Sequence, residues 1–128
     1  MSVPLWRLAV RSEFSAAHAL RHYRGKCEAV HGHNFAVEVL VEGKKLDEET
    51  ELLMDFKEIK NRLKEVLEKL DHQDLNQLPF FGEHNPSSEN ISAWIFKNLR
   101  PFFAGEPVRL VSVTVAEKST QSATYMEI

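Results

Sequence analysis

The chain has 128 residues, of which 43% are hydrophobic and 27% are charged, with a formal net charge of -3. These values predict one soluble globular domain over residues 1–128, and the slight excess of negative charge argues against nucleic-acid or anionic membrane partners. No apolar run is long enough to cross a bilayer, and the single cysteine excludes an internal disulfide. We therefore expect a cytoplasmic protein.

The first half of the chain predicts two strands and a helix. Residues 5–14 alternate between apolar and polar side chains, and a separate strand-like run ends at His18. A polar excursion fills residues 15–30, after which alternation resumes from about 33 to 42. Beyond Asp55, a plausible N-cap, apolar residues recur at helical spacing, which predicts an amphipathic helix.

The second half predicts one more helix and two closing strands. The Asn85–Asn90 segment combines capping side chains with a proline and an early carboxylate, so it predicts a helix start. Residues 108–117 and 122–128 alternate again. The order ββααββ indicates an α+β fold, with a four-stranded antiparallel sheet and both helices on one face. Self-assembly would remove the exposed edges of such a sheet.

Three histidines suggest a metal site. His31 and His33 flank one glycine, so on a strand their side chains leave the same face about 6.6 Å apart. His18 ends the preceding strand-like run and could supply a third nitrogen. Three neutral nitrogens leave a coordination position open, as catalytic zinc sites do. The alternative is that each histidine is a hydrogen-bonded loop residue.

Three further residues are candidates for proton transfer. Cys27 lies four residues before His31 in a polar loop, where a thiolate beside zinc could act as ligand, nucleophile or base. Asp71 and His72 lie where the first predicted helix closes. The negative end of the helix dipole favours a histidine there but not a carboxylate, so we expect Asp71 to orient an imidazole.

Two glutamates are candidates for ligand binding. Glu117 has the parity of the valines in the 108–117 strand, so we expect it along the face that they bury. A carboxylate there needs a partner, and it could accept two parallel N–H bonds from a planar ligand edge; alternatively it turns out to solvent. Glu89 has a structural alternative too, because a carboxylate in the first turn complements the helix dipole.

Six segments, in the order of the chain, together resemble the 6-pyruvoyl-tetrahydropterin synthase family. They are Phe14–His18, Cys27–Asn34, Met54–Phe56, Leu70–Asn76, Pro86–Asn90 and Val115–Glu117. The chain looks most like the bacterial branch that forms 6-carboxy-5,6,7,8-tetrahydropterin. This resemblance implies the tunnelling fold (T-fold), in which ββααββ subunits join into barrels. It also implies a homohexamer of two stacked trimers, with active sites between subunits.

The resemblance further implies the roles of the candidate residues. Zn²⁺ would be held by His18, His31 and His33, while Glu117 would anchor the pterin and Glu89 would be a second carboxylate near the pocket. Cys27, Asp71 and His72 would form the catalytic triad. The implied activity is that of a zinc-dependent lyase of queuosine biosynthesis, which converts 7,8-dihydroneopterin triphosphate to 6-carboxy-5,6,7,8-tetrahydropterin, acetaldehyde and triphosphate.

The presence of Glu28 allows more than one prediction for the pterin that the reaction releases. Some relatives lack the cysteine and carry a glutamate at this spacing, and they resemble enzymes that release 6-hydroxymethyl-7,8-dihydropterin for folate synthesis; here Cys27 and Glu28 occur together. A 6-pyruvoyl product is another alternative, as is a non-catalytic, zinc-stabilised pterin-binding module. We also hypothesise that the cations Arg21, Arg24 and Lys26 meet the triphosphate.

Overall fold

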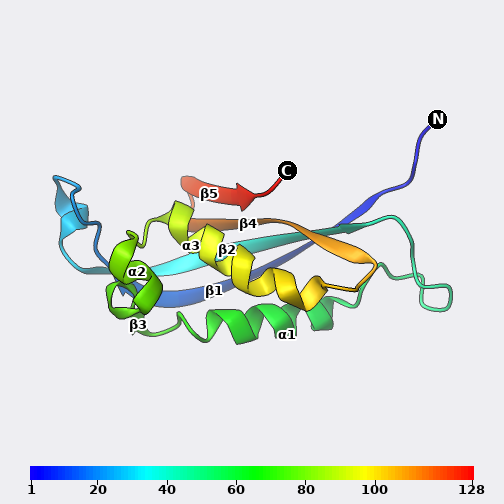
Figure 1. Cartoon of the computed structure of the whole chain (residues 1–128), viewed down its shortest axis with the longest axis horizontal. Helices are drawn as coiled ribbons and strands as arrows, with labels where there is room; N and C mark the ends of the chain where they lie inside the picture. Colours follow the sequence, from blue (N-terminus) through cyan, green and yellow to red (C-terminus); the bar gives the residue numbers. More distant parts are fainter.

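The computed structural model describes all 128 residues and has a single five-stranded sheet (Figure 1). Its strands are β1 (Trp6–His18), β2 (His31–Gly43), β3 (Gln73–Asp74), β4 (Val108–Lys118) and β5 (Gln121–Met126). They lie in the order β3-β1-β2-β4-β5, and all pairs are antiparallel except β1 with β3. The predicted α+β class is confirmed, but two-residue β3 adds a fifth strand too short to be recognised by alternation.

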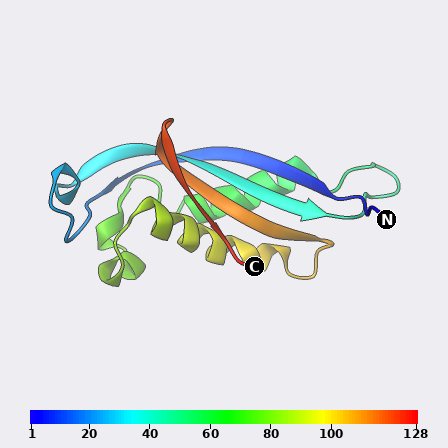
Figure 2. The same cartoon turned by 90° about the horizontal axis from the view of Figure 1, so that it is seen from above.

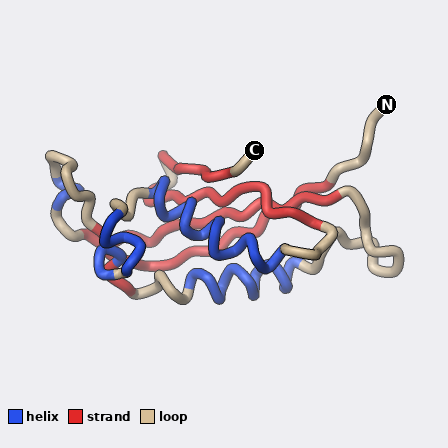
Figure 3. The backbone as a smooth tube through the Cα atoms, in the orientation of Figure 1, coloured by secondary structure: helices blue, strands red, loops and turns tan.

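Two long helices lie against one face of the sheet, as Figures 2 and 3 show: α1 (Phe56–Leu67) and α3 (Ser88–Leu99). Asp55 caps α1 by accepting a hydrogen bond from the Lys57 amide at 2.9 Å, as predicted. Ser87 caps α3 by accepting from the Asn90 amide at 3.2 Å. The sequence did not predict the short elements η1 (Lys26–Glu28), η2 (Leu75–Gln77), α2 (Pro79–Glu83) and η3 (Arg100–Phe103).

Two predicted boundaries were wrong. The first strand runs unbroken from Trp6 to His18, because each of its residues pairs with β2, so the polar excursion begins only after His18. Helix α1 ends at Leu67, so Asp71 and His72 lie beyond its last turn. The helix-dipole argument for Asp71 therefore does not apply, and its position needs another explanation.

The core lies between the helices and the facing side chains of the sheet. Phe14 and Phe35 are cross-strand partners whose rings stack at 4.9 Å between centroids. Strand β4 contains a bulge: Leu40 pairs with Ser112 and Val41 with Leu110, which leaves Val111 as the extra residue. Val111 is thus outside the core cluster, contrary to the predicted alternation, whereas Val113 and Val115 belong to it.

The two ends of the sheet carry different features (Figure 1). The N-terminus and the 44–55 loop lie at one end, where Glu42 of β2 bridges Arg7 at 3.0 Å and Arg109 at 2.8 Å. The loop that joins β1 to β2 lies at the other end, beside α2, and it contains Cys27. No helix is both long and apolar enough to span a membrane.

Candidate metal centre and active site

The register of β1 and β2 brings the three histidines together. His18 pairs directly with His31, and His33 follows two residues later on the same face as Phe35. The ring centroid of His18 lies 4.6 Å from the ring centroid of His31 and 5.4 Å from that of His33. One nitrogen of each ring lies within 4.8 Å of the other two, so the predicted cluster can hold a metal ion. We call these three residues the histidine cluster.

Backbone carbonyls orient two of the rings. His18 Nδ1 lies 2.6 Å from the Pro86 carbonyl oxygen, and His31 Nδ1 lies 2.8 Å from that of Ala29. A carbonyl oxygen can only accept, so both Nδ1 atoms carry the proton and the neutral rings keep their lone pairs on Nε2. Metal-binding histidines are held in this way, with the second nitrogen donating to a carbonyl or carboxylate.

The carboxylate of Glu117, on β4, lies beside two residues of the histidine cluster. Its Oε1 lies 3.4 Å from His18 Nε2, and its Oε2 lies 3.6 Å from His33 Nε2. Glu117 is only 16% exposed, so its predicted inward orientation is confirmed. His18 is fully buried, and its Nε2 has no hydrogen-bond partner. A buried lone pair facing a carboxylate fits a bound cation, which would satisfy both acceptors.

Burial also sets the charge state of His18. It lowers the pKa of His18 below 6.5, while the Pro86 carbonyl and the Glu117 carboxylate oppose this shift and the neighbouring His31 and His33 add to it. A lowered pKa keeps the imidazole neutral near pH 7, and metal coordination requires the neutral form.

A pocket of about 290 Å³ adjoins the histidine cluster, and we call it the Cys27 pocket. Its lining includes Cys27 from η1, Glu89 from the first turn of α3 and Glu117 from β4. Ser88, also in the lining, places its hydroxyl 3.5 Å from Glu117 Oε1. Cys27 is partly exposed. Glu117 lines this pocket and also faces His18 and His33, so it connects the pocket with the candidate metal site.

Asp71 and His72 form a pair at the edge of β1. The Ser15 amide donates to Asp71 Oδ1 at 2.9 Å, while His72 Nδ1 lies 3.0 Å from Asp71 Oδ2. The His72 amide donates back to the Ser15 carbonyl at 2.6 Å, and His72 has a left-handed φ of 59°. The Ser15 amide, followed by His72, lowers the pKa of Asp71. Asp71 therefore orients the imidazole, as predicted, although strand β1 rather than a helix holds it.

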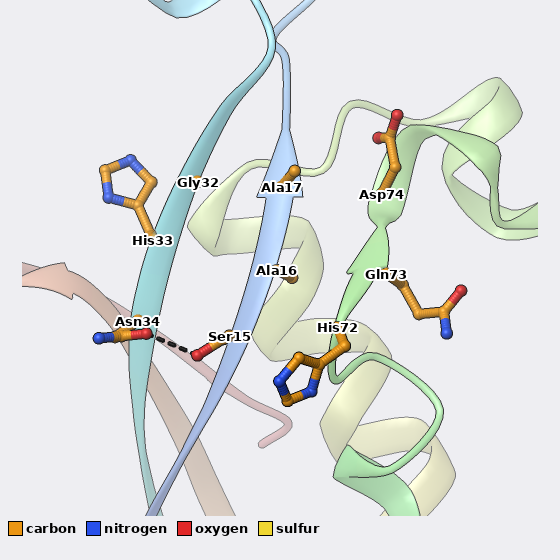
Figure 4. A pocket seen from close by; sticks show the side chains of 9 residues that line it. All are labelled: Ser15, Ala16, Ala17, Gly32, His33, Asn34, His72, Gln73 and Asp74. Atoms are coloured by element: carbon orange, nitrogen blue, oxygen red, sulfur yellow. Dashed lines mark hydrogen bonds between the residues drawn. The ribbon is translucent and has the colours of Figure 1, made fainter.

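The Asp71–His72 pair does not meet Cys27 within one chain. His72 lines an open polar groove of about 530 Å³ together with residues of β1 and β2, whereas Cys27 lines a different pocket. In Figure 4 the Ser15 side chain lies between Asn34 and His72, and the Ser15 hydroxyl donates to Asn34 Oδ1 at 2.5 Å. The His72 side chain is 82% exposed, so its ring is free to contact another molecule.

Two asparagines hold the start of the loop that carries Cys27. The Asn76 side chain bonds the amide and carbonyl of Ala19, at 2.8 and 3.0 Å. The Asn85 side chain does the same for Arg21, at 2.9 Å in each bond. Leu20 lies between Ala19 and Arg21, and its amide donates to the Cys27 carbonyl at 2.7 Å. From the sequence, these asparagines stand out only as members of longer segments. Their role in holding the loop is not predictable locally, because each bonds backbone groups about 60 positions away along the chain.

The remaining predicted residues have different surroundings. The Arg21 guanidinium donates to the carbonyls of Phe81 and His84, so it supports the loop and is not a free cation. Arg24 and Lys26 are exposed, and neither forms an ion pair. Glu28 is exposed as well and does not line the Cys27 pocket, although it follows Cys27 directly.

The chain is similar to several known proteins in sequence and in fold. The chain is 40% identical over 125 residues to a 6-carboxy-5,6,7,8-tetrahydropterin synthase of Synechocystis, covering 94% of this chain and 93% of that protein. It is 36% identical over 100 residues to a dihydroneopterin monophosphate aldolase of Pyrococcus furiosus, covering 78% and 80%. The fold resembles that of a 6-pyruvoyl tetrahydropterin synthase of Caenorhabditis elegans, with a TM-score of 0.87, 26% identity and coverage of 100% and 99%.

The family model for 6-pyruvoyl tetrahydropterin synthase matches residues 7–128, from the second residue of β1 to the end of the chain. This range includes the histidine cluster, the lining of the Cys27 pocket and the Asp71–His72 pair. The chain therefore belongs to the 6-pyruvoyl tetrahydropterin synthase family.

Proposed function

We propose that this protein is a zinc-dependent lyase that converts 7,8-dihydroneopterin triphosphate and one water molecule to 6-carboxy-5,6,7,8-tetrahydropterin, acetaldehyde and triphosphate. The observation that carries the proposal is the convergence of Cys27, Glu89 and Glu117 on one pocket beside the histidine cluster. The 40% identity to the Synechocystis synthase over nearly the whole chain supports this reaction among those of the family.

The metal would be held by His18, His31 and His33, whose chemistry suits Zn²⁺. Zinc bound there would polarise oxygens of the substrate side chain and so acidify neighbouring C–H and O–H bonds. Glu117 binds the ring by accepting two parallel N–H bonds from its amide–amine edge, and Glu89 is the second carboxylate of the pocket. This positions the substrate side chain for proton transfer at the Cys27 sulfur.

His72 is the proton-transfer partner of Cys27, and Asp71 fixes its Nδ1 so that Nε2 faces outward. Because one chain keeps Cys27 and His72 in separate pockets, the active site forms between subunits, with the Asp71–His72 pair serving the Cys27 of a neighbour. We propose a cytoplasmic homohexamer of two trimers, with a role in queuosine synthesis. The exposed edges of the sheet are the surfaces through which subunits would join.

A second candidate reaction is release of 6-hydroxymethyl-7,8-dihydropterin. The 36% identity to the Pyrococcus aldolase and the Cys27–Glu28 pair favour it. The exposure of Glu28 outside the pocket lined by Cys27 favours the first reaction, because a catalytic group must reach the substrate. A 6-pyruvoyl product would need the same metal ligands, so only the product separates that reaction from the others.

One experiment tests these alternatives. Purified, zinc-loaded protein is incubated with 7,8-dihydroneopterin triphosphate, and the released pterin is identified by chromatography and mass spectrometry. We expect the 6-carboxy product from the wild type and from Glu28→Ala, and no product from Cys27→Ala. A 6-pyruvoyl or 6-hydroxymethyl product would contradict the proposed reaction. Binding of the substrate without any product would indicate a non-catalytic pterin-binding module.

A further inference from the structure

Tyr23 is the one aromatic side chain that lines the Cys27 pocket. It is 51% exposed, so its ring is open to a molecule in the pocket. The chain has one other tyrosine, Tyr125, which packs against the hydrophobic core and lies edge-to-face on Phe96 with 5.1 Å between the ring centroids. Tyr23 does not belong to that core, so packing within the chain does not account for its ring.

The loop that carries Tyr23 is fixed at both ends. The Leu20 amide donates to the Cys27 carbonyl at 2.7 Å, and this bond closes a short loop over residues 21–26. Gly25 lies against the Tyr23 ring, because a Cβ at position 25 would be only 3.2 Å from Tyr23 Cε1. A side chain there would crowd the ring, so the glycine allows the ring to lie close across the loop backbone.

A carboxylate can hold only one edge of a pterin. Glu117 can accept two N–H bonds in the plane of the ring, but these bonds leave both faces of the ring uncovered. Ligand sites bury most of the surface of a small molecule, and aromatic side chains cover flat rings by offset stacking. Tyr23 is suited to this contact, since the other residues that line the pocket are aliphatic or polar.

We propose that Tyr23 is a substrate-binding residue that stacks on the pterin ring while Glu117 holds its edge. This inference rests on the proposed function, because it places a pterin in the Cys27 pocket. Glu117 recognises the amide–amine edge, which single-ring compounds also have, whereas Tyr23 selects the larger two-ring system through its contact area. Tyr23 and Cys27 lie on one closed loop, so stacking also positions the ring relative to the Cys27 sulfur.

The test compares two ligands that share this edge: pterin, and isocytosine, which keeps the amide–amine edge but has a single ring. Isothermal titration calorimetry measures both dissociation constants for zinc-loaded wild type, for Tyr23→Ala and for Tyr23→Phe, which keeps the aromatic ring. Val30→Ala is the matched control, because Val30 lies in the same β1–β2 connection and is exposed but does not line the pocket. Circular dichroism establishes that each variant is folded.

We expect Tyr23→Ala to weaken pterin binding about 10-fold and isocytosine binding about 3-fold or less. Tyr23→Phe and Val30→Ala should keep both affinities. Wild-type affinity of Tyr23→Ala for pterin would overturn the inference and leave the proposed reaction standing. Equal weakening of both ligands would also overturn it, because a general disturbance of the loop does not discriminate between rings. Failure of the wild type to bind pterin would overturn the pterin site and this inference together.

Discussion

The histidine cluster and the Asp71–His72 pair have opposite surroundings. His18 is fully buried, and its ring contacts a carbonyl, a carboxylate and two further imidazoles, all from the same chain. His72 is 82% exposed, and only Asp71 contacts its ring nitrogen. The first group is assembled by one subunit, whereas the second is oriented by its own chain but open on its other side. Folding of one chain thus assembles the candidate metal site, whereas the His72 ring stays open to contact with another molecule.

The largest expected effect comes from breaking the histidine cluster. His31→Ala should abolish stoichiometric zinc binding and lower kcat/KM by about 10³-fold or more, because the metal supplies several kcal/mol of transition-state stabilisation. Metal analysis and product assays measure both effects. His84→Ala is the control, since His84 stacks on Phe80 away from the cluster and should keep its zinc and activity. Full activity of His31→Ala would contradict a metal-dependent reaction.

Mixing two inactive variants tests whether the pair serves a neighbouring chain. Cys27→Ala and His72→Ala should each lose about 10²-fold or more in kcat, the usual contribution of a general acid or base. After equimolar mixing and subunit exchange, about one site in four combines an intact Cys27 with an intact neighbouring His72, so about a quarter of wild-type activity should return. A mixture as inactive as its components would mean that both groups act within one subunit.

Replacing Asn85 should affect stability and zinc binding less strongly. The Asn85 side chain makes two hydrogen bonds to the Arg21 backbone, and the carbonyl of the next residue, Pro86, orients His18. Asn85→Ala should cost about 1–3 kcal/mol of unfolding free energy, because it leaves a part-buried amide and carbonyl without partners. It should also weaken zinc binding several-fold. Denaturant titration and metal competition measure the two quantities.

Asn98→Ala is the matched control for Asn85, because Asn98 donates only to the Trp94 carbonyl within α3. This variant should leave zinc affinity unchanged. If both asparagine variants weaken zinc binding equally, the effect reflects general destabilisation and not the position of His18.

The smallest expected effect is on the pH dependence of the metal-free protein. Burial lowers the folded-state pKa of His18 below 6.5, so the unfolded state binds the proton more readily, and stability is lost as pH falls below 6.5. The Tm of metal-free protein should therefore decrease between about pH 7.5 and pH 5.5. The lowered pKa of Asp71 affects stability only at more acidic pH. Its contribution to the free energy of unfolding is lost as the pH falls below about 3.8.

His18→Gln should flatten this pH dependence, whatever its effect on the Tm itself. An unchanged slope in the variant would assign the pH dependence to other groups. Zinc should also flatten it in the wild type, because protons and the metal compete for the same nitrogens.

The sequence by itself determined the main elements and the chemical identity of the site. Alternation of apolar residues predicted the four long strands, and an apolar stripe after Asp55 predicted α1, because strands and helices bury one face at their own periods. The His31-Gly32-His33 spacing put two imidazoles on one face. These are local properties of the chain, so a few neighbouring residues suffice to specify them.

Only the tertiary structure decided which distant residues meet. The β1–β2 register places His18 opposite His31, and Pro86 and Glu117 reach the cluster from 68 and 99 positions away along the chain. Strand β3 and the left-handed His72 depend on backbone bonds to β1, and the bulge at Val111 depends on pairing with β2. Such contacts form between segments that no short motif contains, because long-range packing and hydrogen bonding select them.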